Sequence, residues 1–328
     1  MMSKILLIGG SGFVGSFLIR ELDGFKIQNL DKRQSPFYND ITTLCDITKL
    51  NQINFSKQID TVILLAAEHK DDVTPISKYY DVNVKGTKNV LSKMDEFGIK
   101  NFIFTSSVAV YGLNKNNPSE THNVDPFNHY GKSKFQAEKV IKAWFDKDSR
   151  NKSVTIIRPT VIFGERNRGN VFNLLKQISS GKFLMVGSGQ NKKSMAYVGN
   201  VVAFIKDRII KNQLGYNVYN YVDKQDLNMN ELVSLVEKKM GFKIPKFKFP
   251  YFIGFFGGLC FDFIAFLTNK KFSISSVRVK KFCATTQFDS SKVEKIFDAP
   301  YSLEEGLNKT LDHEFINSKE DGVLFFTE

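Results

Sequence analysis

A short apolar run that ends abruptly at a cluster of glycines is the feature that most restricts how this chain folds. Residues 4–8 read Lys-Ile-Leu-Leu-Ile, residues 9–15 read Gly-Gly-Ser-Gly-Phe-Val-Gly, and apolar residues then recur at helical spacing up to Leu22. Glycines at such a point permit a tight turn and bring backbone N–H groups close to a phosphate at a helix N-terminus. A strand, a glycine-rich turn and a helix in this order predict a dinucleotide-binding unit.

Further strand-like runs, separated by segments of helical period, follow at residues 26–30, 61–66, 101–105 and 154–158. Continuous apolar strands that alternate with helices are typical of a parallel sheet covered on both faces. The predicted fold class is therefore α/β, with a Rossmann-type doubly wound parallel sheet. Such a sheet binds its ligands at the carboxyl ends of its strands.

The second run ends at Asp31, 22 residues after Gly9. A carboxylate at this place accepts hydrogen bonds from both ribose hydroxyls of a dinucleotide and repels a 2′-phosphate. NAD is therefore the expected cofactor, although Lys32 and Arg33, which follow, would suit the phosphate of NADP. The three cysteines and four histidines show no metal-ligand spacing, so a reducing compartment and no metal are expected.

The character of the chain changes after Pro159, where residues 160–170 are rich in Gly, Arg and Asn. We interpret this stretch as a loop that leaves the sheet. The predicted domains are an NAD-binding Rossmann domain over residues 1–165 and a smaller C-terminal α/β substrate lobe over residues 166–328. We assign to this lobe a strand at residues 216–222 and helices at about 200–211 and 230–240.

Tyr130 and Lys134 lie four residues apart and therefore share one face of a predicted helix. A tyrosine titrates near pH ~10, but a nearby ammonium and the positive nicotinamide ring lower its pKa and make a phenolate base available. Such a pair also occurs by chance on surfaces, and it gains weight from Ser107, which follows the predicted strand at residues 101–105. We predict that Ser107, Tyr130 and Lys134 are catalytic, with Tyr130 as the base.

These motifs resemble those of the extended short-chain dehydrogenases/reductases, in the branch of nucleotide-sugar epimerases and dehydratases. The likeness includes Asp46-Ile47, Ala66-Ala67, Asn83-Val-Lys-Gly-Thr87, Val110-Tyr-Gly112, Arg158-Pro159 and Asp289-Ser-Ser-Lys292, and so covers nearly the whole chain. It implies that Asp46 and Ile47 contact the adenine side of NAD and that Lys134 contacts the nicotinamide ribose. The full set of cofactor contacts that we expect is Gly9, Gly12, Phe13, Val14, Gly15, Asp31, Lys32, Asp46, Ile47, Leu65, Ala66, Ala67, Asn83, Tyr130, Lys134 and Arg158. Members of this family often form dimers, so a homodimer is also implied.

Within this branch, a few positions distinguish the reactions that the resemblance allows. In 4,6-dehydratases the residue matching Ser107 is followed by an Asp–Glu pair, whereas Val108 and Ala109 carry no group that transfers a proton. Reductases of the family release NADPH at each turnover, which Asp31 disfavours. The remaining reaction is epimerisation at carbon 4, in which a hydride moves to NAD⁺ and returns to the opposite face of the sugar.

The resemblance also implies where the substrate is held. Lys193 stands where the family usually has a phosphate-binding Arg, and Arg278 lies near the second such Arg. Thr286 stands where galactose-specific members have a large Tyr, so its smaller side chain leaves space for an N-acetyl group. The substrate contacts implied are Ser107, Asn170, Lys193, Arg278 and Thr286.

The formal charge of +12 is concentrated around an aromatic stretch. Residues 240–283 hold eight basic residues and one acidic residue, or +7, and residues 249–267 have Asp262 as their one charge. Three interpretations compete: a membrane-spanning helix, a buried helix of the substrate lobe, and an interfacial segment that is basic at both flanks. We favour the third, a membrane-docking segment at about 243–281. Nucleic acid is disfavoured as a partner because the lysines flank an apolar block.

Four longer stretches, at residues 64–72, 164–170, 193–200 and 276–288, resemble bacterial epimerases of lipid-linked sugars. Such enzymes interconvert N-acetylglucosamine and N-acetylgalactosamine on undecaprenyl diphosphate, for O-antigen and other surface-polysaccharide repeat units. The resemblance implies an isomerase peripheral to the cytoplasmic face of the bacterial inner membrane, with an anionic membrane surface and a polyprenyl-diphosphate-linked amino sugar as its partners. The alternatives are a soluble UDP-N-acetylglucosamine 4-epimerase of the UDP-glucose type and a non-catalytic NAD-binding or membrane-tethering protein. The last would have no need of a phenolate base.

Overall fold

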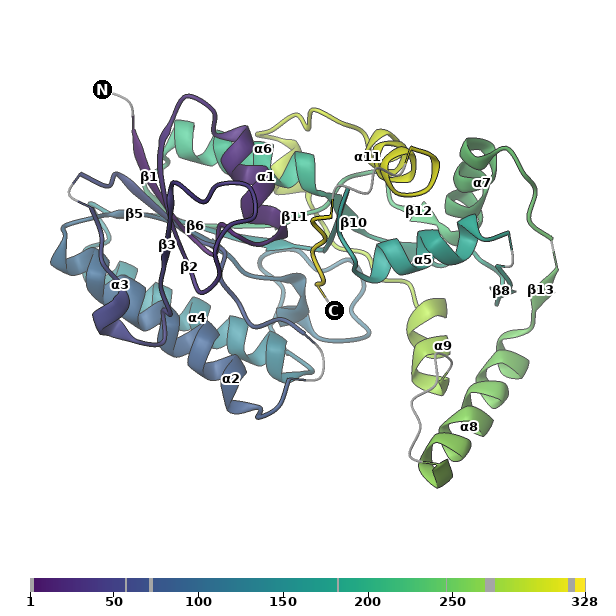
Figure 1. The fold of residues 1–328 in the computed structure, drawn as a ribbon. Helices are drawn as coiled ribbons and strands as arrows, with labels where there is room; N and C mark the ends of the chain where they lie inside the picture. Colours follow the sequence, from purple (N-terminus) through teal and green to yellow (C-terminus); the bar gives the residue numbers. More distant parts are fainter. Residues whose placement is uncertain are drawn as a thin grey trace.

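The computed structural model describes residues 3–56, 58–70, 73–181, 183–245, 247–268, 275–317 and 322–327 (Figure 1). The elements up to residue 159 are β1 (Lys4–Ile8), α1 (Phe13–Glu21), β2 (Lys26–Asp31), β3 (Thr42–Leu44), β4 (Thr61–Leu64), α2 (Ser77–Tyr80), α3 (Thr87–Glu96), β5 (Asn101–Thr105), α4 (His129–Asp146) and β6 (Ser153–Pro159). Strands and helices alternate through most of this part, as the sequence predicts.

The later elements are β7 (Val161–Phe163), α5 (Asn170–Ser179), β8 (Met185–Val186), β9 (Lys192–Lys193), β10 (Met195–Tyr197), α6 (Val198–Lys211), β11 (Gly215–Tyr221), β12 (Leu227–Asn228), α7 (Met229–Met240), β13 (Lys248–Phe249), α8 (Tyr251–Thr268), α9 (Ser276–Cys283), α10 (Ser291–Glu294) and α11 (Leu303–Leu311). The strands outside the main sheet are short and pair two by two.

A seven-stranded parallel sheet in the order β11-β6-β5-β4-β1-β2-β3 forms the centre of the molecule. Successive side chains of β1 enter different cores: Ile5 and Leu7 pack on the side of α1 and α6, whereas Leu6 and Ile8 pack on the side of α3 and α4. Because both faces are covered, every residue of β4 and β6 is buried, including the polar side chains of Ser153, Thr155 and Arg158 in β6. The predicted Rossmann-type α/β fold is confirmed.

The assignment of residues 216–222 to the substrate lobe is wrong. This segment is β11, which pairs in parallel with β6 over the full length of both strands and forms an edge of the main sheet. Its preceding helix, α6, packs on α1. The main sheet therefore takes strands from both sides of residue 165, because the chain returns to the sheet after its excursion through β7–β10.

Helices α8 and α9 lie side by side and extend away from the rest of the molecule (Figure 1). Gly258 is the one buried residue of α8. The interpretation of this segment as a buried helix of the lobe is therefore wrong. Its near-continuous apolar sequence has no polar face from which the direction of packing could be read.

Candidate active site

The glycine-rich turn after β1 closes so tightly that side chains are excluded from it. Gly9 has a φ of +93°, and a Cβ atom there would lie 2.4 Å from the backbone nitrogen of Ala66. A Cβ atom on Gly15 would lie 2.4 Å from the Cα of Gly10. Gly12 precedes the first residue of α1 and provides no side-chain cap, so the first N–H groups of this helix are available to a phosphate.

Asn29, which the sequence analysis missed, holds this turn in place. Its side chain is fully buried in β2, where Oδ1 accepts a hydrogen bond from the N–H of Gly10 at 2.9 Å. Its Nδ2 donates to the hydroxyls of Ser11 and Thr42 at 3.1 and 3.0 Å. The available signal was an amide within a strand of the predicted buried sheet, because a buried amide in a strand needs partners outside the strand ladder.

Asp31 ends β2 beside the same turn. Its Oδ2 accepts a hydrogen bond from the N–H of Ser11 at 3.0 Å, and its Oδ1 accepts one from the N–H of Arg33 at 3.0 Å. Each oxygen has further acceptor capacity for a ribose hydroxyl. The side chain of Lys32 is exposed. A glycine-rich turn at an uncapped helix start, with a carboxylate next to it, fits a dinucleotide.

The residues expected on the adenine side follow β3. Oδ1 of Asp46 accepts hydrogen bonds from the N–H and the hydroxyl of Thr48 at 3.0 and 2.8 Å, which hold its pKa low although burial raises it. Ile47 is buried against Gly86, where a Cβ atom would lie 2.6 Å from the Ile47 Cδ1. The two side chains are therefore held in fixed positions, and their contact with adenine stays a prediction.

The loop after β4 is held at the same edge of the sheet. The N–H groups of Leu65 and Ala66 both donate to the carbonyl of Ile8, at 2.8 and 2.9 Å, and Ala67 continues the loop. Asn83 is buried, accepts from the N–H of Glu68 at 2.9 Å and donates to the Ser133 hydroxyl at 2.8 Å. Its side chain thus ties this loop to α4, and a direct contact of Asn83 with NAD stays a prediction.

Ser107 and Tyr130 come together where β5 ends and α4 begins. The Ser107 Oγ accepts a hydrogen bond from the N–H of Ala109 at 3.1 Å and caps a short turn of 3₁₀ helix. Asn128 caps α4 by accepting from the N–H of Gly131 at 2.9 Å. Gly131 is required for the close approach, because a Cβ atom there would lie 2.5 Å from the Ala109 carbonyl oxygen.

Burial dominates the pKa values of the predicted catalytic residues Tyr130 and Lys134. It raises the pKa of Tyr130 to about 12, although hydrogen bonding with Ser107 lowers it. It lowers the pKa of Lys134 to about 7, although the Glu138 carboxylate raises it. The Lys134 Nζ donates to the Thr105 carbonyl at 2.7 Å and lies 4.6 Å from the ring centre of Phe104. Desolvation therefore dominates the pKa of Tyr130 in this structure, and the lowering expected from Lys134 and the nicotinamide ring stays a prediction.

Of the expected substrate residues, Lys193 and Thr286 are direct neighbours, joined by a backbone bridge between β9 and the segment after α9. The Lys193 Nζ donates to the carbonyls of Lys281 and Ala284 at 2.8 and 2.5 Å, and burial lowers its pKa to about 8. Arg278 lies on the exposed surface of α9. The structure therefore groups these three residues around α9.

Asn170 is separate from this group in the fold: it is exposed and is the first residue of α5. The segment after Thr286 leads back to the catalytic turn, since the ring of Phe288 lies 6.1 Å from that of Tyr111. The lobe and the Ser107 turn are thus in physical contact through this segment.

Comparison with known proteins identifies the family. A family model described as the NAD dependent epimerase/dehydratase family matches residues 5–220. The chain belongs to this family. NAD is accordingly its cofactor, and the predicted family, fold and cofactor are confirmed.

Individual members of the epimerase family differ widely in their sequence identity to this chain. The chain is 59% identical over 331 residues, covering all of both chains, to the N-acetyl-alpha-D-glucosaminyl-diphospho-ditrans,octacis-undecaprenol 4-epimerase of Escherichia coli O157:H7. It is 30% identical to the UDP-glucose 4-epimerase of Vibrio cholerae, with 94% of this chain and 95% of that one covered. The UDP-glucuronic acid 4-epimerase of Bacillus cereus, solved in complex with NAD, shares the fold with a TM-score of 0.71 at 21% identity, with 94% and 98% of the two chains covered.

Arg158 lies below the epimerase site, with its side chain turned into the protein. Its guanidinium donates to both carboxylate oxygens of Glu138, at 3.0 and 2.6 Å, and to the Tyr111 hydroxyl at 2.7 Å. Arg158 and Glu138 are each about 95% buried. Glu138 also accepts from the hydroxyl of Ser106, the neighbour of Ser107. This network holds Ser106, which precedes the predicted catalytic residue Ser107, and a contact of Arg158 with NAD stays a prediction.

Replacing Glu138 by Gln is expected to lower the free energy of unfolding by about 3 kcal/mol or more, because it leaves the buried Arg158 charge without its carboxylate. Urea-induced unfolding followed by circular dichroism measures this. Glu96→Gln is the matched control: its pair with Lys93 is half exposed, so a change within about 0.5 kcal/mol is expected. Equal effects of the two substitutions would contradict the role of the buried pair.

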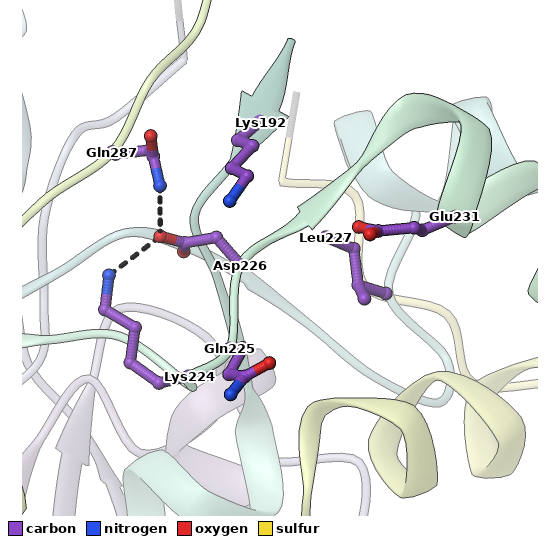
Figure 2. Close-up of a pocket in the computed structure, with 7 residues that line it drawn as sticks. All are labelled: Lys192, Lys224, Gln225, Asp226, Leu227, Glu231 and Gln287. Atoms are coloured by element: carbon purple, nitrogen blue, oxygen red, sulfur yellow. Dashed lines mark hydrogen bonds and ion pairs between the residues drawn. The ribbon is translucent and has the colours of Figure 1, made fainter. Parts of the chain in front are cut away.

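A polar cavity of about 320 Å³ lies in the lobe beside β9 and β12. Lys192, Lys224 and Glu231 are among its lining residues (Figure 2). Figure 2 shows the Asp226 carboxylate between Lys224 and Gln287, which donate to it at 2.7 and 2.9 Å. Because Asp226 is nearly fully buried and its partners neutralise it, we assign this cluster to the framework of the lobe.

Proposed function

We propose that this protein is an NAD-dependent 4-epimerase that interconverts N-acetylglucosamine and N-acetylgalactosamine on undecaprenyl diphosphate. The observation that carries the proposal is the 59% identity over the full length of both chains to an epimerase whose name specifies that carrier. The UDP-glucose 4-epimerase is a distant relative at 30% identity. Ser107, Tyr130 and Lys134 supply the catalytic groups that the reaction needs.

The chemistry divides between cofactor and protein. When bound, NAD⁺ accepts a hydride from carbon 4 of the sugar and later returns it. Tyr130, as phenolate, removes the proton of the 4-hydroxyl and gives it back in the second half of the cycle. Ser107 hydrogen-bonds the same hydroxyl and orients it. Because burial raises the Tyr130 pKa to about 12 even though hydrogen bonding with Ser107 lowers it, the phenolate depends on positive charge from Lys134 and the nicotinamide ring.

The diphosphate of the substrate has a cation available in the lobe. Lys193, with its pKa lowered to about 8, is mostly charged at neutral pH. Its ammonium donates to two carbonyls near the end of α9, which fix its position, and no ion pair with a carboxylate is formed among the residues that the structure describes. Arg278 is exposed on the same helix. A sugar anchored through its diphosphate in this way is free to rotate between the two hydride transfers.

We infer that α8 and α9 dock the enzyme on an anionic membrane at the cytoplasmic face, where the polyprenyl chain lies. Within the described residues, α8 is the helix long and apolar enough to cross a bilayer. Its exposed apolar side chains are Tyr251, Phe252, Ile253, Phe256, Leu259, Phe263, Ile264, Phe266 and Leu267. Apolar surface on this scale indicates an interaction site.

Packing between α8 and α9 favours an interfacial hairpin over a membrane span. A Cβ atom on Gly258 would lie 2.6 Å from the backbone nitrogen of Ser276, so the two helices touch. Asp262, the one charge of α8, accepts hydrogen bonds from the N–H and the hydroxyl of Ser276 at the start of α9. A span of α8 would therefore pull the start of basic α9 into the hydrocarbon, which is costly for its charges.

Basic side chains surround the apolar face, as binding to anionic lipid requires. The exposed ones are Lys243, Lys248, Arg278, Lys280 and Lys281. Lys246, Lys270 and Lys271, which we also assigned to the docking segment, lie outside the described residues. The combination of an apolar ridge with flanking cations matches the inner leaflet and disfavours a purely apolar protein partner.

Supplied separately, the undecaprenyl-diphosphate-linked N-acetylglucosamine is expected to be converted at least about tenfold faster than UDP-N-acetylglucosamine, because the lipid-linked form alone uses the docking surface. Identification of the product sugar by chromatography after hydrolysis measures both rates. A Tyr130→Phe preparation gives the background. Comparable or faster conversion of the UDP-sugar would instead support the soluble UDP-sugar epimerase, whose α8 would then cover a dimer surface.

A further inference from the structure

The C-terminal segment, residues 322–327, folds back onto the centre of the molecule (Figure 1). The N–H of Phe325 donates to the carbonyl of Arg166 at 2.9 Å, and its carbonyl accepts from the N–H of Arg168 at 2.8 Å. The Thr327 hydroxyl donates to the Asn167 side chain at 3.1 Å. The end of the chain is therefore paired like a short strand with the loop that joins β7 to α5.

The ring of Phe325 contacts both loops that we expect to hold the cofactor. Its centre lies 6.0 Å from that of Phe13, the first residue of α1 after the glycine-rich turn. It lies 6.4 Å from the ring centre of Phe37, which belongs to the loop after Asp31. The glycine-rich turn has few side chains of its own with which to pack, so the Phe325 ring supplies contacts that it lacks.

The loop on the other side of Phe325 is itself fixed. The Arg166 guanidinium lies 5.0 Å from the ring centre of Phe37, and Arg168 forms an ion pair with Glu314 at 2.7 Å. A Cβ atom on Gly169 would lie 2.6 Å from the Thr327 hydroxyl, so the segment sits directly on this loop. Phe325 is thus held between the cofactor loops of the sheet and a rigid part of the lobe.

We propose that Phe325 is a positioning residue of the NAD site. It holds Phe13 and the loop after Asp31 in the geometry that binds NAD, and it slows cofactor release. The reaction returns the hydride to the sugar from the same cofactor molecule. Slow release of the cofactor therefore keeps the oxidised sugar from being left without the molecule that reduces it. This inference depends on the NAD dependence of the family and not on the identity of the sugar.

Phe325→Ala is expected to release NAD at least about tenfold faster than the unaltered protein, because the cofactor loops lose the ring that packs on them. The release rate is measured by exchanging bound NAD for isotopically labelled NAD, and bound NAD is quantified after gel filtration and heat release. Phe326→Ala is the matched control, since its neighbouring ring is 65% exposed and should leave both values unchanged. Phe325→Leu, which keeps apolar volume, should restore most of the retention.

Thermal unfolding of the NAD-free proteins separates this role from a purely structural one. A Phe325→Ala protein with a lower melting temperature and an unchanged NAD release rate would overturn the proposal. Faster release together with intact folding would support it. Neither result depends on turnover of any sugar, so failure of the proposed epimerase substrate would leave this test unaffected.

Discussion

Replacing Tyr130 by Phe is expected to lower the turnover rate by about 10³-fold or more while bound NAD is retained, because the substitution removes the proton acceptor and little volume. The rate of epimerisation and the NAD content of the purified protein are the two measurements. Tyr301→Phe is the control, since Tyr301 packs its ring on Tyr197 and lies outside the predicted site. A turnover rate of the Tyr130→Phe protein within tenfold of that of the unaltered protein would show that Tyr130 is not the base.

Ser107→Ala tests the same site through its pH dependence. Hydrogen bonding with Ser107 lowers the pKa of Tyr130, so its loss raises that pKa. The phenolate is then formed only at higher pH, and the pH at which kcat reaches half its maximum should move upward. A slower enzyme with an unmoved pH profile would mean that Ser107 acts on the sugar alone.

Features that are local in sequence were predictable in this protein. The glycine-rich turn and Asp31 lie within one strand-turn-helix-strand unit, and Tyr130 and Lys134 lie on one helix, α4, as their spacing predicted. The predicted parallel sheet followed from apolar runs that are buried on both faces, as β4 and β6 are. Such patterns are predictive because the local structure of a strand, turn or helix is determined by a few neighbouring residues.

Features that depend on burial or on distant partners were not predictable. Asn29 and the Glu138–Arg158 pair act through contacts that only the folded sheet creates. The strong desolvation that raises the Tyr130 pKa was not predictable, because no sequence pattern reports how completely a phenol is buried. The strand at residues 216–222 was placed in the lobe because a strand sequence does not say which neighbour it will pair with.

The surroundings of helix α8 could also not be predicted from its sequence. An apolar helix gives no amphipathic period, so spanning, burial and interfacial docking all fit its sequence. The structure excludes burial through the exposure of its side chains, and the pairing of Asp262 with Ser276 ties it to a basic helix. The two interpretations that remain, membrane spanning and interfacial docking, are tested by measuring binding to membranes.

Replacing Phe252, Phe256 and Phe263 by Ser is expected to weaken binding to anionic vesicles by about 100-fold or more. The three rings are 59–63% exposed along one stripe of α8, and each partly inserted Phe contributes about 1 kcal/mol from apolar burial. Co-sedimentation with vesicles of phosphatidylglycerol and phosphatidylethanolamine measures the loss. NAD content should stay constant, because α8 extends away from the cofactor loops.

Ile210→Ser with Leu214→Ser is the matched control, because these side chains are 64% and 63% exposed at the end of α6 and just beyond it, outside the docking surface. Raising the salt concentration from about 0.05 M to about 0.5 M should weaken binding of the unaltered protein, since the Debye length over which the flanking cations act falls from about 14 Å to about 4 Å. If the three-Phe variant binds vesicles as the control does, α8 is not the docking element. If it is released while its turnover of the lipid-linked sugar is unchanged, docking is not needed for access to the substrate. Loss of both binding and lipid-linked turnover, with NAD retained, is the result that the exposed apolar ridge and its basic surroundings predict.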